Sequence, residues 1–225
     1  MNIVEIGQQF DPLSSFLWVF IGFIVVLWLI LVFFSLKKEG LLRTVRFFVP
    51  MMIAAAFIES SGVANGRFSY PNYLIYFAAL GGGVPLVILM GWSTNLYIFL
   101  RMSVLSITPY YDKKNVVQIG LVSLGAAVVG ICLDVLEDPL AHYLGWWVWP
   151  EDVAGSLLFG VPLSNYVDWV IILFVMSFMT LWIEYTGFSE RRKVLLSFFS
   201  LPIVFGVIVV LHMGVDGLLS IVGAV

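Results

Sequence analysis

The chain has 225 residues, of which 61% are hydrophobic and 11% are charged, and its formal net charge is −3 at pH 7. Soluble domains typically contain about 45–50% apolar and about 25% charged residues, so this composition indicates an integral membrane protein. The acidic balance argues against a nucleic-acid partner. A single cysteine, Cys132, excludes a disulfide framework and a thiolate metal site.

Six apolar runs are long enough to cross a bilayer, which takes roughly 20 residues per helix. They cover residues 16–36, 44–63, 74–100, 116–138, 166–185 and 194–211. The segment before the first run carries Glu5 and Asp11 and no basic region, so that run is predicted to be a span and not a cleavable signal peptide. The apolar tail at 212–225 is broken by Gly214, Asp216 and Gly217, and is expected to form a short cap or a kinked extension. We therefore expect an all-α integral membrane protein, with six or seven transmembrane helices in one domain over residues 1–225.

The basic residues predict the orientation of these spans. Ten of the eleven lysines and arginines lie in the loops after the first, third and fifth spans, and only Arg67 lies on the other side. The ten are Lys37, Lys38, Arg43, Arg46, Arg101, Lys113, Lys114, Arg191, Arg192 and Lys193. By the positive-inside rule the basic side is cytoplasmic and the N-terminus is outside. We expect a multi-pass protein of a prokaryotic plasma membrane.

Two segments of the chain repeat one ordered pattern. The second span ends in ESSGVANGRFSYP and the fourth in DPLAHYLGWWVWP. Aligning Glu59 with Asp138 matches a glycine, then two aromatic residues separated by one residue, and then a proline. Both copies later read GVPL, at 83–86 and 160–163, and after five further residues both have a tryptophan, Trp92 and Trp169.

This pattern predicts parallel repeats, at about 44–100 and 116–185. Spans two and four run in the same direction, as do spans three and five, so the copies would be related by a pseudo-twofold axis along the membrane normal. Such an axis would place Glu59 and Asp138 opposite one another at the same depth.

The stretch ICLDVLEDPLAHYLGWWVWP, residues 131–150, places three acids ahead of a tryptophan cluster. Asp134 and Asp138 are four residues apart and share a helix face, while Glu137 lies on an adjacent face. Pro139 predicts that the helix ends or kinks here. Carboxyls inside a bilayer usually face a bundle interior or a functional cavity, which favours a site role for Glu59, Asp134 and Asp138.

The other acidic residues on this side of the membrane are better explained as solvent-exposed residues than as part of a site. Glu137, Glu151 and Asp152 are expected to sit in water at helix or loop ends, with Glu137 facing away from the site. For Asp168, beside Trp169, exposure to water and a role in the site are both open. Trp146 is typical of an aromatic belt at the membrane interface.

A buried acid among aromatic rings suggests one kind of chemistry. Burial and like-charge neighbours favour the neutral form of a carboxyl, which can then donate a proton, and aromatic faces stabilise a developing cation. Protonation of an alkene to a carbocation uses both features. The expected lining is Tyr70, Trp92, Trp147, Trp149 and Trp169, with Asn165 and Asp168 as polar contacts.

The sequence lacks the residues that several common cofactors and metal sites need. His142 and His212 are the only histidines, which excludes a multi-histidine iron site. No glycine-rich dinucleotide motif or P-loop occurs. We therefore expect neither a metal, a redox cofactor nor a nucleotide.

The segments GRFSYP…GGGVPLVILMGW, LDVLEDPLAHYLGWWVW and FGVPLSNYVDW resemble the membrane-bound carotenoid biosynthesis family. That family includes the cofactor-independent carotenoid hydratases of the bisanhydrobacterioruberin and γ-carotene type. The resemblance covers about residues 59–169. It implies a carotenoid or other polyene substrate, and addition of water across a terminal isoprenoid double bond to give a tertiary alcohol.

On this hypothesis Glu59, Asp134 and Asp138 supply the general acid and base, and which residue has which role stays open. A carotenoid cyclase forms the same cation and differs in what quenches it. A polyprenyl transferase would use DVLED to hold Mg²⁺ and diphosphate. A non-enzymatic membrane protein that binds pigment or lipid is the remaining alternative.

Overall fold

A computed structural model describes residues 12–70, 76–79, 82–107, 115–150 and 157–221. Five described helices are long and apolar enough to cross a membrane, and a bent pair can form a sixth span, which confirms the prediction of an all-α membrane protein. The elements in chain order are α1 (Pro12–Glu39), α2 (Leu41–Ala64), β1 (Tyr76–Ala79), β2 (Gly82–Pro85), α3 (Leu86–Ile107), α4 (Val116–Tyr143), β3 (Leu157–Leu158), β4 (Val161–Pro162), α5 (Leu163–Glu184), α6 (Glu190–Phe199) and α7 (Leu201–Ile221).

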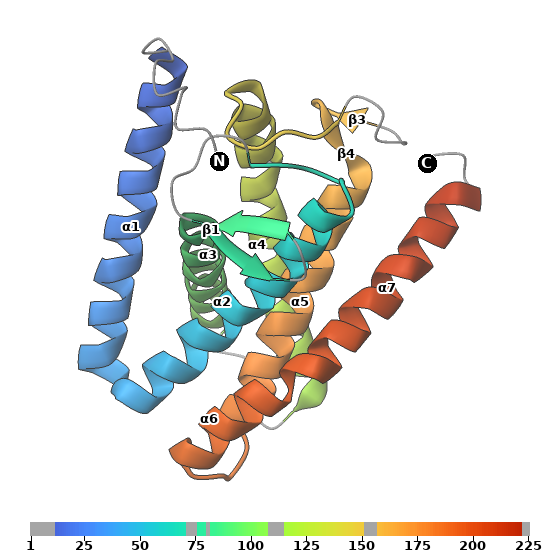
Figure 1. The fold of residues 1–225 in the computed structure, drawn as a ribbon. Coiled ribbons are helices and arrows are strands. Elements are labelled where there is room, and N and C mark those ends of the chain that lie inside the picture. Colours follow the sequence, from blue (N-terminus) through green and yellow to red (C-terminus); the bar gives the residue numbers. More distant parts are fainter. Residues whose placement is uncertain (1–11, 71–75, 80–81, 108–114, 151–156, 222–225) are drawn as a thin grey trace.

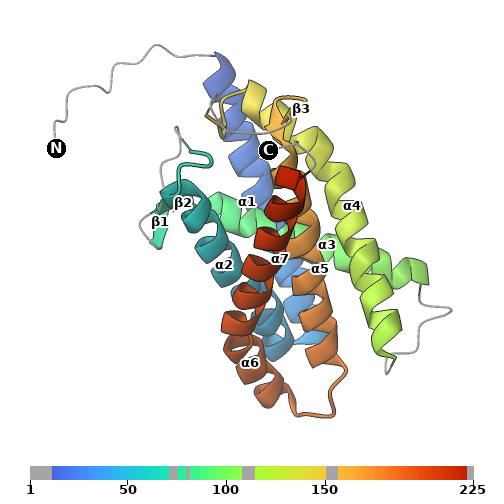
Figure 2. The ribbon, with the colours of Figure 1, turned by 90° about the vertical axis from the view of Figure 1, so that its right-hand side faces the viewer.

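The helices form a bundle with one helix crossing in front of the others. Figure 1 shows α1 and α7 on opposite sides, with α2 in front of α3, α4 and α5. Figure 2 shows α7 beside α2 and α5 from the side. The closest packing occurs where Gly130 of α4 lies against Leu173 of α5 and Phe99 of α3, because a β-carbon at this glycine would collide with both. Small residues at such crossings are the usual device for close packing of membrane helices.

The predicted third span, 74–100, was wrong at its start. Its first part forms the antiparallel hairpin β1–β2, in which Phe77 pairs with Val84, and the helix begins only at Leu86. Glycine is a poor helix former, and Pro85 has no N–H to give to a helix, so the GGGVP segment favours an extended path. The second copy does the same on a smaller scale, because β4 ends at Pro162 and α5 begins at Leu163.

Two helices continue past residues at which the sequence predicts an end or a kink. Helix α4 continues through Pro139 to Tyr143, since a proline near a helix end removes a single hydrogen bond of the ladder. Helix α7 continues through Gly214, Asp216 and Gly217 instead of ending as a cap. Each glycine costs about 1 kcal/mol relative to alanine, which a long apolar helix tolerates.

The bend of the sixth span lies earlier than predicted. Helices α6 and α7 meet at Ser200 with an angle of 42°. Pro202 lies in the first turn of α7, where its missing N–H is tolerated. The last span is therefore a short polar helix followed by a long apolar one.

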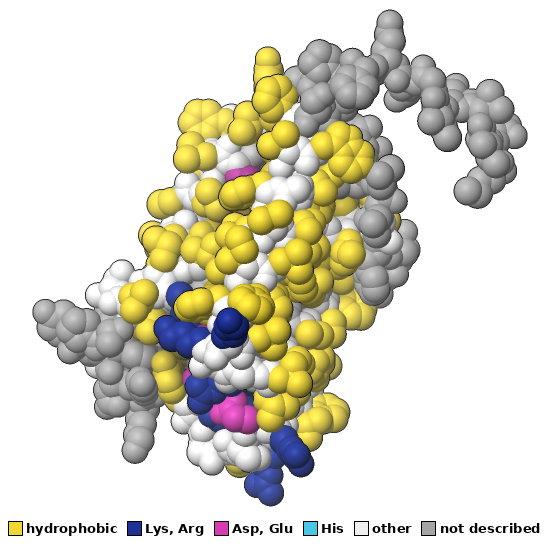
Figure 3. All heavy atoms as spheres, turned by 90° about the vertical axis from the view of Figure 1, so that its left-hand side faces the viewer, with side chains coloured by type: hydrophobic (Ala, Val, Ile, Leu, Met, Phe, Trp, Pro, Cys, Tyr) yellow, Lys and Arg dark blue, Asp and Glu magenta, His cyan; other side chains and the backbone are white. Residues whose placement is uncertain are grey.

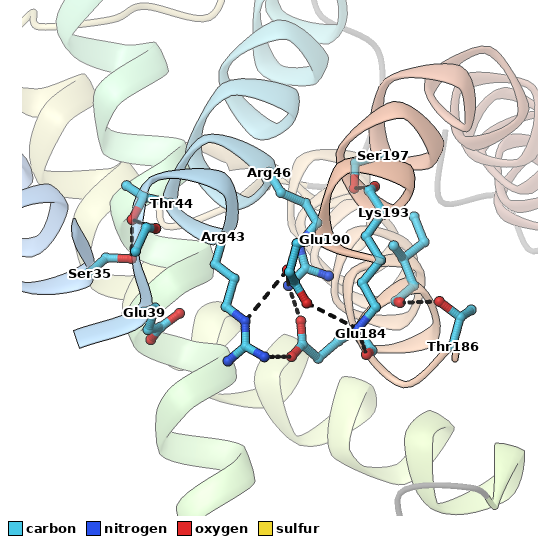
Figure 4. A network of polar contacts seen from close by, with 12 residues as sticks. Ser35, Glu39, Arg43, Thr44, Arg46, Glu184, Thr186, Glu190, Lys193 and Ser197 are labelled. Carbon is cyan, nitrogen blue, oxygen red and sulfur yellow. Dashed lines mark hydrogen bonds and ion pairs between the residues drawn. The ribbon is translucent and has the colours of Figure 1, made fainter. Parts of the chain in front are cut away.

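A partly buried ionic network joins α6 to α2 and α5 near the turn between α5 and α6. Glu184 and Glu190 face three cations, Arg43, Arg46 and Lys193, with separations of 3.4–3.7 Å for four of the ion pairs. Arg46 also forms a direct hydrogen-bonded pair with Glu184. Figure 4 shows these side chains converging from the three helices.

The outer surface is apolar, with charge collected at one end. Figure 3 shows hydrophobic side chains over most of the face that carries α1, with the lysines and arginines near one end. Of the described lysines and arginines, Arg67 alone lies at the opposite end, beside the loops that follow α2 and α4. Glu5, Asp11, Lys113, Lys114, Glu151 and Asp152 lie outside the described residues.

The predicted orientation can be tested with single cysteines in a Cys132→Ser background. We expect Ser69→Cys to react with a membrane-impermeant maleimide added outside the cell, and Ser189→Cys to react only after the membrane is opened. Both serines are exposed and lie at opposite ends of the bundle. Labelling of both positions from the same side would overturn the topology.

Candidate active site

The chain leaves α2 and α4 through the same turn. Gly66 and Gly145 have φ angles of 70° and 67°, a backbone region that favours glycine. Arg67 N donates to Gly62 O over 3.0 Å, and Trp146 N donates to Ala141 O over 2.8 Å. These are the 6→1 hydrogen bonds of Schellman caps, and they turn both loops back over the end of the bundle.

The two loops then pair with each other. Ser69 N donates to Val148 O over 2.9 Å, and Val148 N donates to Ser69 O over 3.0 Å. In the alignment that matches Glu59 with Asp138, Ser69 and Val148 occupy equivalent positions. The bridge brings the aromatic residues of both loops together, and the rings of Tyr70 and Trp147 lie 6.3 Å apart, edge to face.

A cavity of about 550 Å³ lies beneath the paired loops. This volume is typical of a pocket for a small organic ligand. Nine of the ten predicted site residues line it, namely Glu59, Tyr70, Trp92, Asp138, Trp147, Trp149, Asn165, Asp168 and Trp169. The cavity is thus apolar with a few acidic and amide groups.

Glu59 is buried on α2 and is held by two aromatic donors. Tyr70 donates its hydroxyl to Oε2 over 2.5 Å, and Trp92 donates Nε1–H to Oε1 over 2.6 Å. Each carboxyl oxygen therefore has its own donor, which fixes the plane of the carboxyl group. A carboxylate with these partners is suited to orient a water molecule.

Asp138 is buried on α4 and has a similar pair of donors. Trp147 donates Nε1–H to Oδ1 over 3.2 Å, and Asn165 donates from Nδ2 to Oδ2. The two acids thus face one cavity from two helices, and each is bonded to an indole.

Asp134 lies one turn before Asp138 and is fully buried. It does not line the cavity, contrary to the expectation that all three acids would. Neither of its oxygens has a hydrogen-bond donor among the described residues, and its strongest electrostatic neighbour is Asp138. Asp134 therefore lies near Asp138 but outside the cavity wall.

The expected position of Glu137 was wrong. Its side chain lines the cavity and is only partly exposed. Neighbouring residues on a helix are about 100° apart, so a wide cavity at the end of α4 reaches both Glu137 and Asp138.

Two indoles form one wall of the cavity. The rings of Trp92 on α3 and Trp169 on α5 stack with centroids 4.4 Å apart and an interplanar angle of 28°. These are the tryptophans that follow GVPL in the two copies of the sequence pattern.

Sequence reasoning missed a charged cluster at the edge of the cavity. Arg67 Nη2 lies 3.0 Å from Asp168 Oδ2, and His212 Nδ1 lies 2.6 Å from Asp168 Oδ1. The cluster ties the loop after α2 to α5 and α7. Arg67 gave a usable signal, because a cation isolated on the less basic side of a membrane protein needs an acidic partner.

Comparison with known proteins decides the family. A model of the carotenoid biosynthesis protein family matches residues 16–225, which is nearly the whole chain. The chain belongs to this family. A search of curated proteins and a search of solved structures returned no significant match. Membership in the carotenoid biosynthesis family confirms the resemblance noted for residues 59–169 and extends it over the flanking spans.

Family membership gives the chain a role in carotenoid biosynthesis. The cavity lies between apolar helices and holds a few polar groups in a largely apolar lining.

Proposed function

We propose that this protein is a carotenoid hydratase that adds water to a terminal double bond of a polyene without a cofactor. One observation carries the proposal: two buried carboxyls, Glu59 and Asp138, face one apolar cavity beside stacked indoles. A proton donor, a cation-stabilising wall and a group that can orient water are the three parts that alkene hydration needs.

The acid in this mechanism is the Asp134–Asp138 pair. A buried carboxylate without donors is strongly disfavoured, so the two neighbouring acids together retain one proton. Asp138 faces the cavity and delivers this proton to the less substituted alkene carbon. The π electrons form the new C–H bond, and the other carbon becomes a tertiary cation.

The base is Glu59. The cation is stabilised by the faces of Trp92 and Trp169, and a water oxygen adds to it. The proton that this water loses passes to Glu59, whose carboxylate is oriented by Tyr70 and Trp92. Transfer through water returns the proton to the aspartate pair and completes the cycle.

Pigment analysis separates this function from two alternatives. We expect co-expression with a lycopene-producing pathway to yield pigments heavier by one or two waters, as measured by mass spectrometry. Unchanged mass with a new absorption spectrum would indicate a cyclase. Unaltered pigments that co-purify with the protein would indicate a binding protein without activity.

Chelation tests the remaining alternative, a polyprenyl transferase that needs Mg²⁺ for diphosphate. Among the described residues, no three histidine, cysteine, aspartate or glutamate side chains are placed to hold a metal ion. We expect hydration to continue in EDTA, because proton transfer and water capture use carboxyls alone. Loss of activity in EDTA that Mg²⁺ restores would favour the transferase.

A further inference from the structure

The cavity extends to the outer surface of the bundle between α2 and α7. Phe57 of α2 and Val209 of α7 both line it, yet their exposed fractions are 38% and 53%. A residue that lines a cavity and is also exposed marks a place where the cavity meets the surroundings. Ile172 of α5 also lines the cavity and is buried.

The side of the cavity that faces α1 is covered, whereas at the end of the bundle exposed Asn65 also lines the cavity. On the α1 side Phe20 stacks on Trp146 with centroids 4.6 Å apart, and Ile24 is buried. At the end of the bundle the backbone bridge between Ser69 and Val148 joins the two loops.

The opening between α2 and α7 has apolar residues at one end and polar residues at the other. The rings of Phe57 and Phe205 meet edge to face with centroids 5.4 Å apart. About two turns further along α7, His212 pairs with Asp168. Helix α7 as a whole packs mainly on α5 and touches α2 only lightly. The opening therefore faces the hydrocarbon region, and its charged limit lies toward the membrane surface.

We propose that the polyene chain passes between α2 and α7, with its end group in the cavity and the rest of the chain in the bilayer. This inference rests on the proposed function for the identity of the end group that reacts. A cavity of about 550 Å³ has the size of a drug-sized ligand site, so it holds an end group and not an entire carotenoid. The remaining hydrocarbon stays in an apolar phase only if it leaves sideways into lipid.

Two neighbouring valines provide a matched test. Val209 lines the cavity, whereas Val210 is 68% exposed and is not part of the cavity wall. We expect Val209→Trp to lower hydration of a full-length carotenoid by at least about tenfold, since an indole fills the passage. Hydration of a short isoprenoid alkene with the same end group should fall much less. Val210→Trp should retain wild-type turnover with both substrates.

Two results of this experiment would overturn the passage. One is full activity of Val209→Trp on the long carotenoid. The other is an equal loss in Val209→Trp and Val210→Trp, which would point to a general effect of bulk on α7.

A binding measurement keeps the inference testable without catalysis and without a large side chain. In detergent and in a Cys132→Ser background, lycopene at about ten times its Kd should slow maleimide labelling of Val209→Cys about tenfold. Labelling of Val210→Cys should be unchanged. Protection at Val209 without any hydration would contradict the proposed function and retain the passage. Equal labelling rates with and without lycopene at Val209 would refute the passage.

Discussion

Replacing Asp138 by asparagine should lower hydration turnover by about 10²–10⁴-fold, the usual contribution of a general acid. The asparagine keeps the shape of the side chain and its oxygen can still accept from Trp147, but it cannot carry the transferred proton. Folding should be retained, as judged by size-exclusion chromatography and Tm in detergent. Turnover is measured as hydrated carotenoid formed per protein.

The same experiment extends to the other two acids. Asp134→Asn removes the partner that shares the proton, and Glu59→Gln removes the base, so both should be severely impaired. Glu39→Gln is the matched control, because Glu39 bonds to Tyr97 and Arg101 at the opposite end of the bundle. Glu137→Gln cannot serve as a control, since Glu137 lines the cavity. Hydration by a triple variant without Glu59, Asp134 and Asp138 would end the mechanism.

Replacing Arg46 by methionine should lower the free energy of unfolding by about 2–4 kcal/mol. Removing one partner of a buried ion pair leaves the other charge uncompensated, which typically costs about 3–5 kcal/mol. The Arg46 side chain is 9% exposed, and its partner Glu184 is 28% exposed, so solvent screens the pair weakly. The nearby Arg43 and Lys193 offset part of the loss. Thermal unfolding in detergent should show a Tm lower by roughly 5–10 °C.

Arg43→Met is the matched control for Arg46→Met. Arg43 faces the same two carboxylates, Glu184 and Glu190, but its side chain is 44% exposed. Exposed ion pairs contribute about 0–1 kcal/mol, so this variant should unfold close to the wild-type temperature. Equal losses in the two variants would mean that burial does not determine the strength of this network.

Hydropathy predicted the helices well because each span must bury an apolar surface in lipid. It could not place their ends inside an apolar run. Residues 74–100 contain a strand hairpin and a helix that are both apolar, and the break before Leu86 depends on glycine and proline geometry. The bend at Ser200 was missed for a similar reason, since α6 is polar and its position depends on ion pairs with Arg43 and Arg46 of α2.

The repeated motif and its neighbouring residues predicted nine of the residues that line the cavity. It could not resolve which side of α4 meets the cavity. Asp134 and Asp138 share a helix face, yet only Asp138 of these two lines the cavity, while Glu137 on the adjacent face also reaches it. The contact of His212 with Asp168 joins residues 44 positions apart and left no local pattern in the sequence.

The exposure of Phe57 and Val209 at the cavity wall has a kinetic consequence. For a site that opens to lipid, the occupancy by an organic substrate depends on the mole fraction of that substrate in the membrane. Its concentration per volume of the whole solution does not determine saturation. Diluting the carotenoid with phospholipid at constant total carotenoid would then lower the rate, as surface-dilution kinetics requires. The availability of water, the second reactant, is set by the aqueous phase and not by the membrane. The two substrates therefore have concentrations that the cell can vary independently, one through membrane composition and the other through the hydration of the interface.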